Sequence, residues 1–523
     1  MDKSEVLNIF HPRVKEWFLN NIGVPSPLQV EGWPQIRSGK NVLISAPTGS
    51  GKTLAAFLES INRLLVMGLN NELPDGVFIL YVSPLKALNN DINKNLEIPL
   101  QGIRRLFAEK GEDFPDIRKA VRTGDTSQYE RAQILKKPPH IMITTPESLF
   151  LMLTSIKARE ILENVHYMII DEIHTLLGTK RGVHLAVSME RVEELAQRKI
   201  IRIGLSATVN PLDAAARYLG GLYRTGNDFS ERPVEIIAPD IERGKELKIH
   251  VPVEDYRVLE QGSVWPDIYT SLVKLIREHR STLVFENDRA TAERVAANVN
   301  AIADEELCRP HHGSISRNRR LETEERFKAG KLRCIIATST LELGIDVGSV
   351  DFIVQVSAPP AVSAGLQRLG RAGHRLSAVS KGVIIPKTRV DLVKSCFIAK
   401  EMLDARIEKE RIPENCLDIL AQHIVSKCCT GKWHENDLYS LVRQAYSYRN
   451  LREDDFRKVL AMLAGDYEHN EDIPAKPRIL WDRQNKTVIG SDYSKMLALS
   501  GSGTIPDRGH VSCLPRRLQD PGW

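Results

Sequence analysis

The sequence contains no apolar run long enough to cross a membrane. A bilayer span needs about 20 consecutive apolar residues, and no run in this chain approaches that length. The first residues, MDKSEVLNIFHPRV, are acidic and polar where a secretory signal has a basic segment followed by an apolar one. We therefore expect a cytoplasmic protein without a membrane partner.

Cysteine is sparse and is not spaced for metal binding. No CxxC pair occurs, and no cysteine has a second cysteine or a histidine nearby at zinc spacing. We predict reduced thiols, with neither a zinc site nor an iron–sulfur cluster. The seven cysteines are Cys308, Cys334, Cys396, Cys416, Cys428, Cys429 and Cys513.

A strong excess of charge of one sign is also absent. The chain has 72 Lys and Arg against 67 Asp and Glu, a formal net charge of +5. This mild basic balance suits a polyanionic partner, and it suits many enzymes that never touch nucleic acid equally well. Because single cores stop growing at about 250 to 300 residues, 523 residues predict three or four domains.

Short apolar runs bounded by turn residues recur in two series and predict buried parallel strands. Two doubly wound α/β units in tandem are the economical interpretation. The extended, charged stretch from Arg232 to Asp255 is the expected linker. The runs are NVLIS, FILYVS, IMITT, YMIID and IIRIGLS in the first unit, and TLVFE, CIIAT, FIVQV and GVIIP in the second.

After about Asp404 the pattern changes to three short amphipathic helices, in PENCLDILAQHIV, DLYSLVRQAY and DDFRKVLAMLA. RILWDRQNKTVIG then predicts a hairpin with its turn near Asn485 and Lys486. Helices followed by a hairpin predict a winged helix. The expected division is a first α/β unit at 1–231, a second at 256–404, the winged helix at 405–475 and the start of a β-rich module at 476–523.

The segment APTGSGKT, from Ala46 to Thr53, fits a phosphate-binding loop in which Ala46 replaces the first glycine. It follows a predicted strand and precedes a predicted helix, which disfavours the alternative of an ordinary glycine-rich turn. Backbone N–H groups at Thr48, Gly49, Ser50 and Gly51 would surround the phosphates of ATP. Lys52 would pair with the outer phosphates, and Thr53 would hold Mg²⁺.

Two acidic residues follow the strand YMII. Asp171 and Glu172 stand where a carboxylate reaches the carboxyl edge of the sheet. Asp171 would bind Mg²⁺ through water, and Glu172 would orient or deprotonate the attacking water. For His174, coupling and a plain structural role are equally supported.

QRLGRAGH, from Gln367 to His374, places arginines in the second unit. An arginine supplied across a cleft stabilises the charge that develops during phosphoryl transfer. Arg371 is the predicted arginine finger. If the nucleotide lies between the two units, hydrolysis would open and close the cleft and drive stepping on a strand.

In order and spacing, these motifs resemble those of superfamily 2 helicases. The particular combination is similar to the Lhr (large helicase-related) family, through IPENCLDILAQHIV and WDR to SGTIPDRG. The resemblance implies two tandem RecA-like P-loop NTPase domains and a winged helix. The matching segments are PSPLQ, APTGSGKT, PLKALNN, TPESL, DEIH with KRGVHL, SAT, HHGS, TSTLELGID and QRLGRAGH.

The resemblance also implies site residues. Gln29 would read adenine, Gly344 and Asp346 would lie at the nucleotide, and Ser206 and Thr208 would join His174 in coupling. Some hydroxyl side chains are predicted to contact the nucleic-acid strand. Their alternative role is to cap a helix, because TPES is a good capping sequence. The residues that fall where relatives touch the nucleic-acid strand are Pro84, Lys86, Thr145, Glu147, Ser148, His312, Gly313, Thr338 and Thr340.

One position departs from the common superfamily pattern. His374 stands where many relatives have a second arginine, a role that Arg368 or Arg375 would then fill.

Trp481, in the predicted hairpin, would stack on a base or close the core of the C-terminal module. Trp433 is expected to pack.

The resemblance implies an ATP-dependent helicase that tracks 3′-to-5′ on single-stranded DNA, separates DNA or RNA–DNA duplexes and serves DNA repair or recombination at the nucleoid. The alternatives are an RNA-remodelling ATPase like the DEAD-box group and an ATP-gated clamp or annealing factor. After Gly509 the tail HVSCLPRRLQDPGW departs from the family pattern. We therefore expect a truncated family member whose last module is only begun.

Overall fold

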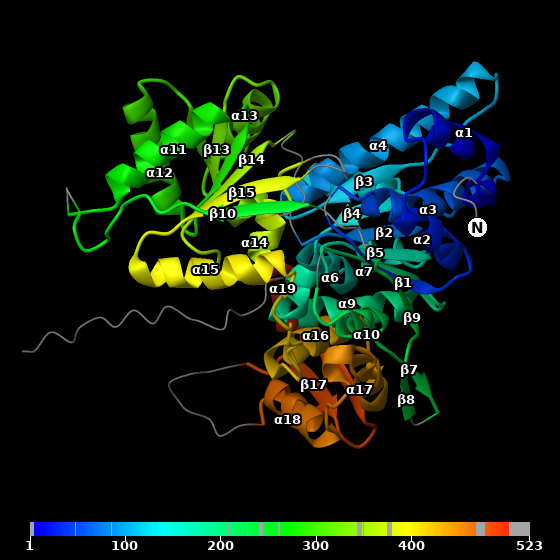
Figure 1. Ribbon diagram of the computed structural model, residues 1–523. Helices are drawn as coiled ribbons and strands as arrows, with labels where there is room; N and C mark the ends of the chain where they lie inside the picture. Colours follow the sequence, from blue (N-terminus) through cyan, green and yellow to red (C-terminus); the bar gives the residue numbers. More distant parts are fainter. Residues whose placement is uncertain are drawn as a thin grey trace, which may run out of the picture.

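The structure is a computed structural model of two α/β units and a smaller third module (Figure 1). It describes residues 5–47, 49–84, 86–207, 209–226, 228–239, 244–259, 262–342, 348, 350–373, 379–466 and 476–501; for 86–91, 93–95, 340, 499 and 500 it describes the backbone alone. Among these residues, no helix is long and apolar enough to cross a membrane.

The first unit is built on a seven-stranded parallel sheet in the order β3-β4-β2-β5-β6-β1-β9. Its central strands are apolar on both faces because helices cover both sides, which is what parallel sheets require. The strands are β1 Asn41–Ser45, β2 Ile79–Val82, β3 Lys119–Arg122, β4 Ile141–Thr144, β5 Tyr167–Ile170, β6 Ile201–Ser206 and β9 Val234–Ile237.

The helices of this unit divide between the two faces of the sheet. Helices α2, α3 and α4 pack on one face, and α6, α9 and α10 pack on the other. The elements are η1 Glu5–Ile9, α1 Pro12–Asn21, α2 Pro27–Arg37, α3 Lys52–Leu69, α4 Lys86–Glu109, α5 Gln128–Lys136, α6 Pro146–Thr154, α7 Ile156–Glu160, α8 His174–Leu177, α9 Lys180–Ala196 and α10 Leu212–Gly220, with a hairpin of β7 Leu222–Thr225 and β8 Asp228–Glu231.

The second unit has a six-stranded parallel sheet in the order β10-β15-β14-β11-β13-β12. The strands are β10 Lys245–Ile249, β11 Thr282–Phe285, β12 Cys308–His311, β13 Cys334–Ala337, β14 Phe352–Val356 and β15 Ser380–Ile385. The helices are α11 Trp265–Glu278, α12 Arg289–Ala303, α13 Arg317–Lys328, η2 Ser339–Leu341, α14 Val362–Leu369 and α15 Arg389–Leu403.

The third module has the predicted three helices and hairpin, with a short additional strand that completes a three-stranded antiparallel sheet. This arrangement confirms the predicted winged helix. The elements are α16 Leu417–Cys428, β16 Trp433–His434, α17 Glu435–Gln444, η3 Tyr446–Tyr448, α18 Glu453–Ala464, β17 Ile479–Asp482, β18 Thr487–Gly490 and α19 Asp492–Ser500.

The predicted linker from Arg232 to Asp255 is wrong in its extent. Strand β9 pairs with β1, so the first sheet extends beyond the predicted boundary at residue 231. Strand β10 pairs with β15, so the second sheet begins before residue 256. Both are edge strands with charged side chains, a composition that hides a strand from a search for apolar runs.

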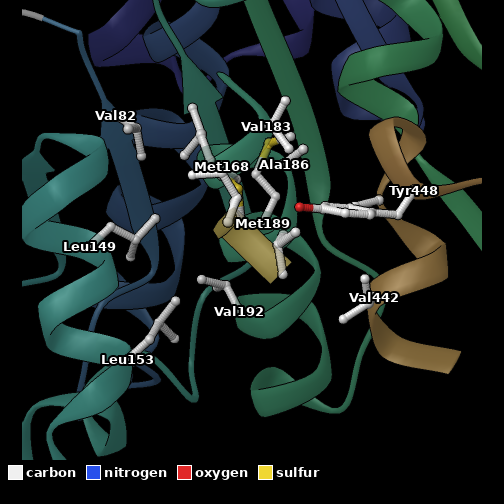
Figure 2. Packing of buried hydrophobic residues seen from close by; sticks show 14 of the residues in the cluster. Val82, Leu149, Leu153, Met168, Val183, Ala186, Met189, Val192, Val442 and Tyr448 are labelled. Carbon is white, nitrogen blue, oxygen red and sulfur yellow. The ribbon is translucent and has the colours of Figure 1, made fainter. Parts of the chain in front are cut away.

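One hydrophobic core is shared by the first unit and the winged helix. Figure 2 shows Val442 and Tyr448 of the winged helix facing Ala186 and Met189 of α9, all of them buried. Polar bridges surround this contact, including the hydroxyls of Thr154 and Ser426 at 2.6 Å. The first unit and the winged helix therefore form a single packed body.

Two buried histidines face each other at this boundary. The rings of His184 and His423 have centroids 4.5 Å apart, and the Nε2–H of His423 donates to the His184 carbonyl at 3.1 Å. Burial, with Arg191 beside both rings, lowers the pKa of His184 to about 4 and that of His423 well below its usual value. Glu147 opposes the shift of His184, while Arg181 adds to it. Both rings are therefore neutral in the folded chain.

These histidines predict a loss of stability in mild acid. Between about pH 6.5 and pH 4 the unfolded chain binds protons at both rings, whereas the folded chain does not, so stability falls as pH drops through this range. One such histidine contributes a loss of about 2 kcal/mol at pH 5. We expect His184→Phe, which keeps the ring packing, to have a smaller drop in denaturation midpoint between pH 7.5 and pH 5 than the unmodified chain. Equal drops would contradict this explanation.

Candidate active site in the first unit and its arginine partner

The phosphate-binding loop joins β1 to α3 at the carboxyl edge of the first sheet. Gly49 and Gly51 both have positive φ, 77° and 87°, a conformation that glycine adopts without strain. Lys52 is the first residue of α3, and its Nζ donates to the carbonyls of Ala46 and, at 3.0 Å, Pro47. These hydrogen bonds close the loop on itself and hold the Lys52 ammonium against carbonyls of the loop.

Gln29 lies against this loop. It is buried, and its Oε1 accepts from the Ser26 N–H at 2.9 Å at the start of α2. A side chain at Gly51 would come within 3.0 Å of Gln29 Nε2, so glycine is needed for this close approach. The predicted adenine reader is therefore beside the loop, and its amide N–H₂ group faces Gly51.

Asp171 follows β5 with its carboxylate held on both oxygens. Oδ2 accepts from the Tyr81 hydroxyl, and Oδ1 accepts from the Glu172 N–H at 2.9 Å. Burial, followed by the charge of Glu172, raises the pKa of Asp171, while Tyr81, the Glu172 N–H and Lys52 oppose the rise. A nearby cation would stabilise the ionised form of such a desolvated carboxylate.

Tyr81 is a residue of the site that the motifs did not identify. It lies on β2, fully buried, and its ring stacks on Phe57 at 5.1 Å between centroids. The sequence signal was a tyrosine inside a buried strand, because its hydroxyl needs a polar partner there. That partner is Asp171.

Glu172 is held in a strained conformation. Its φ is 47°, in the left-handed region that side chains other than glycine rarely adopt. Such strain persists where the surrounding structure enforces it and is concentrated at functional sites. The Glu172 carboxylate is buried, with Oε2 3.6 Å from His174 Nδ1.

His174 joins this acidic pair to the end of β6. Its Nδ1 accepts from the Ala207 N–H at 3.2 Å and lies 3.3 Å from Ser206 Oγ. Burial lowers the pKa of His174, so the ring is neutral and acts as an acceptor. These contacts are compatible with both roles predicted for His174, coupling and a plain structural role.

The arginines of the second unit lie on α14 and just after it. Arg368 is buried in an ion pair with Glu342, with Nη2 to Oε1 at 2.5 Å, and Nη1 donates to Asn287. Arg371 Nη2 donates to the Glu342 carbonyl at 2.8 Å. Glu342, which sequence reasoning missed, therefore anchors both arginines. Both arginines are therefore held near the end of α14, and the finger role of Arg371 stays a prediction.

A cavity of about 250 Å³ lies where the two units meet. His174 of the first unit and Gln367 of α14 both line it. Asn210, Glu408 and Glu410 complete much of the remaining wall. His174 and the arginine-bearing helix α14 are therefore neighbours across one small space.

Some of the first-unit residues predicted to contact the nucleic-acid strand already have partners within the chain. Thr145 caps α6 by accepting from the Ser148 N–H at 3.4 Å, as the capping alternative anticipated. Glu147 forms a bidentate ion pair with Arg181 of α9, at 2.5 and 3.0 Å. Pro84 is buried at the end of β2. Lys86 is the first residue of α4, and the structure describes only its backbone.

In the second unit the corresponding residues follow β12 and β13. His312 is buried, with Nε2 2.8 Å from Glu293 Oε1, and Gly313 is exposed beside it. Thr338 is buried at the end of β13, and Thr340 lies in the short helix η2, where only its backbone is described. These residues therefore lie at the carboxyl edge of the sheet, after two adjacent strands.

Trp481 lies on β17 with its ring partly buried against the shared core. Its Nε1–H donates to Glu435 at 3.0 Å, and the Arg483 guanidinium lies 4.9 Å from the ring centroid. These contacts favour the alternative in which Trp481 closes the core. Trp433 packs as predicted, with its Nε1–H donating to the Lys427 carbonyl.

Some predicted residues lie outside the part of the chain that the structure describes. Ser50 and Thr53 are within it: the Ser50 hydroxyl donates to Pro47, and Thr53 is in the first turn of α3. Those outside are Thr48, Thr208, Gly344, Asp346, His374, Arg375 and Cys513.

Two parallel sheets, with a phosphate loop and an acidic pair on the first and two anchored arginines on the second, are the arrangement of two tandem RecA-like domains. The DEAD/DEAH box helicase family matches residues 26–215, and the helicase conserved C-terminal domain matches residues 267–375. The winged helix domain of the large helicase-related protein matches residues 400–515. Together the three matches span most of the chain, and the last of them is a model of the large helicase-related (Lhr) family.

Individual relatives agree over almost the whole chain. The ATP-dependent helicase Lhr-Core of Methanothermobacter thermautotrophicus is 45% identical over 97% of this chain and 58% of its own length. The Lhr helicase/probable uracil glycosylase of Mycolicibacterium smegmatis is 40% identical, over 97% of this chain and 35% of its own length. The chain therefore spans less than two thirds of these relatives.

Solved structures agree with the fold. The Mycobacterium smegmatis helicase Lhr, solved with ssDNA and AMP-PNP, superposes with a TM-score of 0.88 at 42% identity, covering 96% of this chain and 63% of that one. The DUF1998 helicase MrfA bound to DNA gives a TM-score of 0.73 at 20% identity, covering 95% of this chain and 64% of that one. The second likeness concerns the fold alone.

Proposed function

We propose that the chain is an ATP-driven motor that moves 3′-to-5′ on single-stranded DNA and separates DNA or RNA–DNA duplexes. Its setting would be DNA repair or recombination in the cytoplasm, at the nucleoid. The observation that carries the proposal is the convergence of Lys52, Asp171 and Glu172 at one sheet edge, with His174 joining that edge to the end of β6.

The binding of ATP would rearrange the contacts of Lys52. Its ammonium now rests on carbonyls of its own loop, and phosphate oxygens would replace these weaker acceptors. Backbone N–H groups at Gly49 to Gly51 would face the phosphates at the start of α3. Glu172, fixed by its strained backbone, would orient the attacking water.

The same edge fits a magnesium ion. Asp171 is a buried carboxylate whose orientation is fixed by Tyr81 and the Glu172 N–H, and burial and the charge of Glu172 raise its pKa. Thr53 and Asp171 would hold the ion with waters and phosphate oxygens. When bound, magnesium would neutralise phosphate charge during the transfer.

Arg371 would stabilise the phosphoryl group from the second unit. Its present hydrogen bond to the Glu342 carbonyl holds the guanidinium at the end of α14. Closing the two units would bring it to the nucleotide, and hydrolysis would release it. Because the winged helix shares a core with the first unit, the moving body in this cycle is the second unit.

DNA as the track is supported by the relative that was solved with ssDNA and by the helicase names of the others. Strand displacement on tailed duplexes tests the proposal, with DNA, RNA and hybrid duplexes compared and tails of each polarity. Displacement of DNA and hybrid duplexes with 3′ tails is expected. Preference for short RNA duplexes without a tail would favour a DEAD-box-like remodeller, and ATPase without displacement would favour a clamp or annealing factor.

A further inference from the structure

Residues 405–411 form a strap between α15 of the second unit and the winged helix. The upstream end belongs to the second unit, whereas the downstream end leads into the body formed by the first unit and the winged helix. This short segment is therefore one of the covalent connections between the two bodies, the other being the passage of the chain from β9 to β10. The strap also forms part of the wall of the cavity between His174 and Gln367.

On one side the strap is bonded to the first unit. Asn210 Nδ2 donates to the Ile407 carbonyl at 3.0 Å, and the Glu410 N–H donates to the Asn210 carbonyl at 2.7 Å. Asn210 follows closely after Ser206 and Ala207, the residues that contact His174. Glu410 also lies against Gly178, where a Cβ would meet its Oε2 at 2.6 Å. The first unit thus holds the strap beside His174.

On the other side the strap caps α14. Glu408 Oε1 accepts from the Val362 N–H at 2.5 Å, and Oε2 accepts from the Ser363 N–H at 3.2 Å. The N-cap residue of α14 is Ala361, which has no side-chain acceptor of its own. Exposed N–H groups at a helix start need such an acceptor, and a carboxylate there also interacts favourably with the helix dipole.

Helix α14 is the element that carries the arginines. Its eight residues end at Leu369, and Arg371 follows two residues later, with a backbone hydrogen bond to Arg368. A helix this short is rigid, so a shift or rotation at its first turn moves its last turn by a similar amount. The first turn is held by Glu408, and Glu408 is held beside Asn210.

We propose that Glu408 and Asn210 are positioning residues for Arg371, through a strap that ties the start of α14 to the segment after β6. Glu408 sets where the helix begins, and Asn210 sets where the strap lies on the first unit. The position of the guanidinium then follows the state of the site around His174. This inference rests on the proposed function, since it gives Arg371 its task in ATP hydrolysis.

Steady-state ATP hydrolysis on saturating single-stranded DNA tests the inference in the full chain. We expect Glu408→Ala to lower kcat about tenfold and to change KM for ATP less than about twofold, because the interaction it positions forms in the transition state. Glu408→Gln keeps one amide acceptor, so a loss of about threefold is expected. Asn210→Ala is expected to lower kcat in the same sense, and Lys409→Ala, exposed in the same strap, serves as the matched control.

A double variant separates positioning from a general structural effect. If Glu408 acts through Arg371, Glu408→Ala causes little further loss in an Arg371→Ala background, since coupled residues are not additive. An unchanged kcat in Glu408→Ala, or the same tenfold loss in both backgrounds, overturns the inference. Denaturation midpoints identify a misfolded variant, and Glu408→Gln and Asn210→Ala then carry the test.

The wild-type chain in the same assay distinguishes the two levels of the proposal. Hydrolysis that DNA stimulates, with a normal Glu408→Ala variant, refutes the positioning role alone. A wild-type chain that does not hydrolyse ATP refutes the proposed function, and the positioning role falls with it because no reaction is left to position.

Discussion

Glu172→Gln is expected to reduce ATP turnover by about 10²- to 10⁴-fold, the range typical of a lost general base. The amide keeps the shape of the side chain but neither accepts the proton nor orients water as strongly. Lys52 and the loop are untouched, so the dissociation constant for ATP should change little. Turnover by phosphate release and affinity by nucleotide fluorescence measure the two effects separately.

Glu163→Gln provides the matched control for this substitution. Glu163 is an exposed carboxylate of the same unit, away from the sheet edge, so its amide variant should hydrolyse ATP normally. Retained hydrolysis in Glu172→Gln would contradict the assigned role. A parallel loss of ATP binding would instead indicate that the strained turn at Glu172 had collapsed.

Arg371→Ala is expected to lower kcat by about 10³-fold or more, the effect of removing an arginine finger. Arg371→Lys should recover little, because a lysine lacks the planar fork that suits phosphate. The measurement is kcat on saturating DNA, with the folding of each variant checked by its denaturation midpoint. Near-normal turnover in Arg371→Ala would remove this residue from the reaction.

Arg368→Ala gives the contrasting result. Breaking its buried pair leaves the Glu342 carboxylate without its partner, at a cost in stability of about 3 kcal/mol. The denaturation midpoint should therefore fall in Arg368→Ala, whereas it should change little in Arg371→Ala. The reverse pattern would exchange the roles of the two arginines.

The central strands were predictable because burial on both faces requires continuous apolar runs. The edge strands were not. Strand β10 reads KELKI and β12 reads CRPH, with charges or a proline that an edge position tolerates and a central one does not. Strands β3 and β9 were missed for the same reason. The error in the linker follows directly, because β9 and β10 lie within the segment from Arg232 to Asp255.

The phosphate loop and the acidic pair were predictable because their chemistry depends on local spacing. Tyr81, Glu342, Asn210 and Glu408 were not, because each acts through a contact with a residue distant in sequence. No periodic pattern in the sequence indicates that Glu408 caps a helix whose first residue lies 46 residues earlier. The capping role of Thr145, in contrast, is local and was anticipated by TPES.

The winged helix was predicted as an appended module, and its position changes that view. Leu420, Ile424, Val442 and Tyr448 are buried in the same cluster as residues of α9. Burying this apolar surface between two modules favours one rigid body over a tethered arm. A rigid body on one side of the cleft makes the strap a direct connection between the moving parts.

ATP hydrolysis by the unmodified chain, with and without single-stranded DNA, tests whether the chain is an ATP-driven motor on DNA. We expect a low basal rate, a severalfold or greater stimulation by DNA, and loss of both rates in Lys52→Ala. A rate that DNA does not change, or hydrolysis that persists in Lys52→Ala, would contradict it.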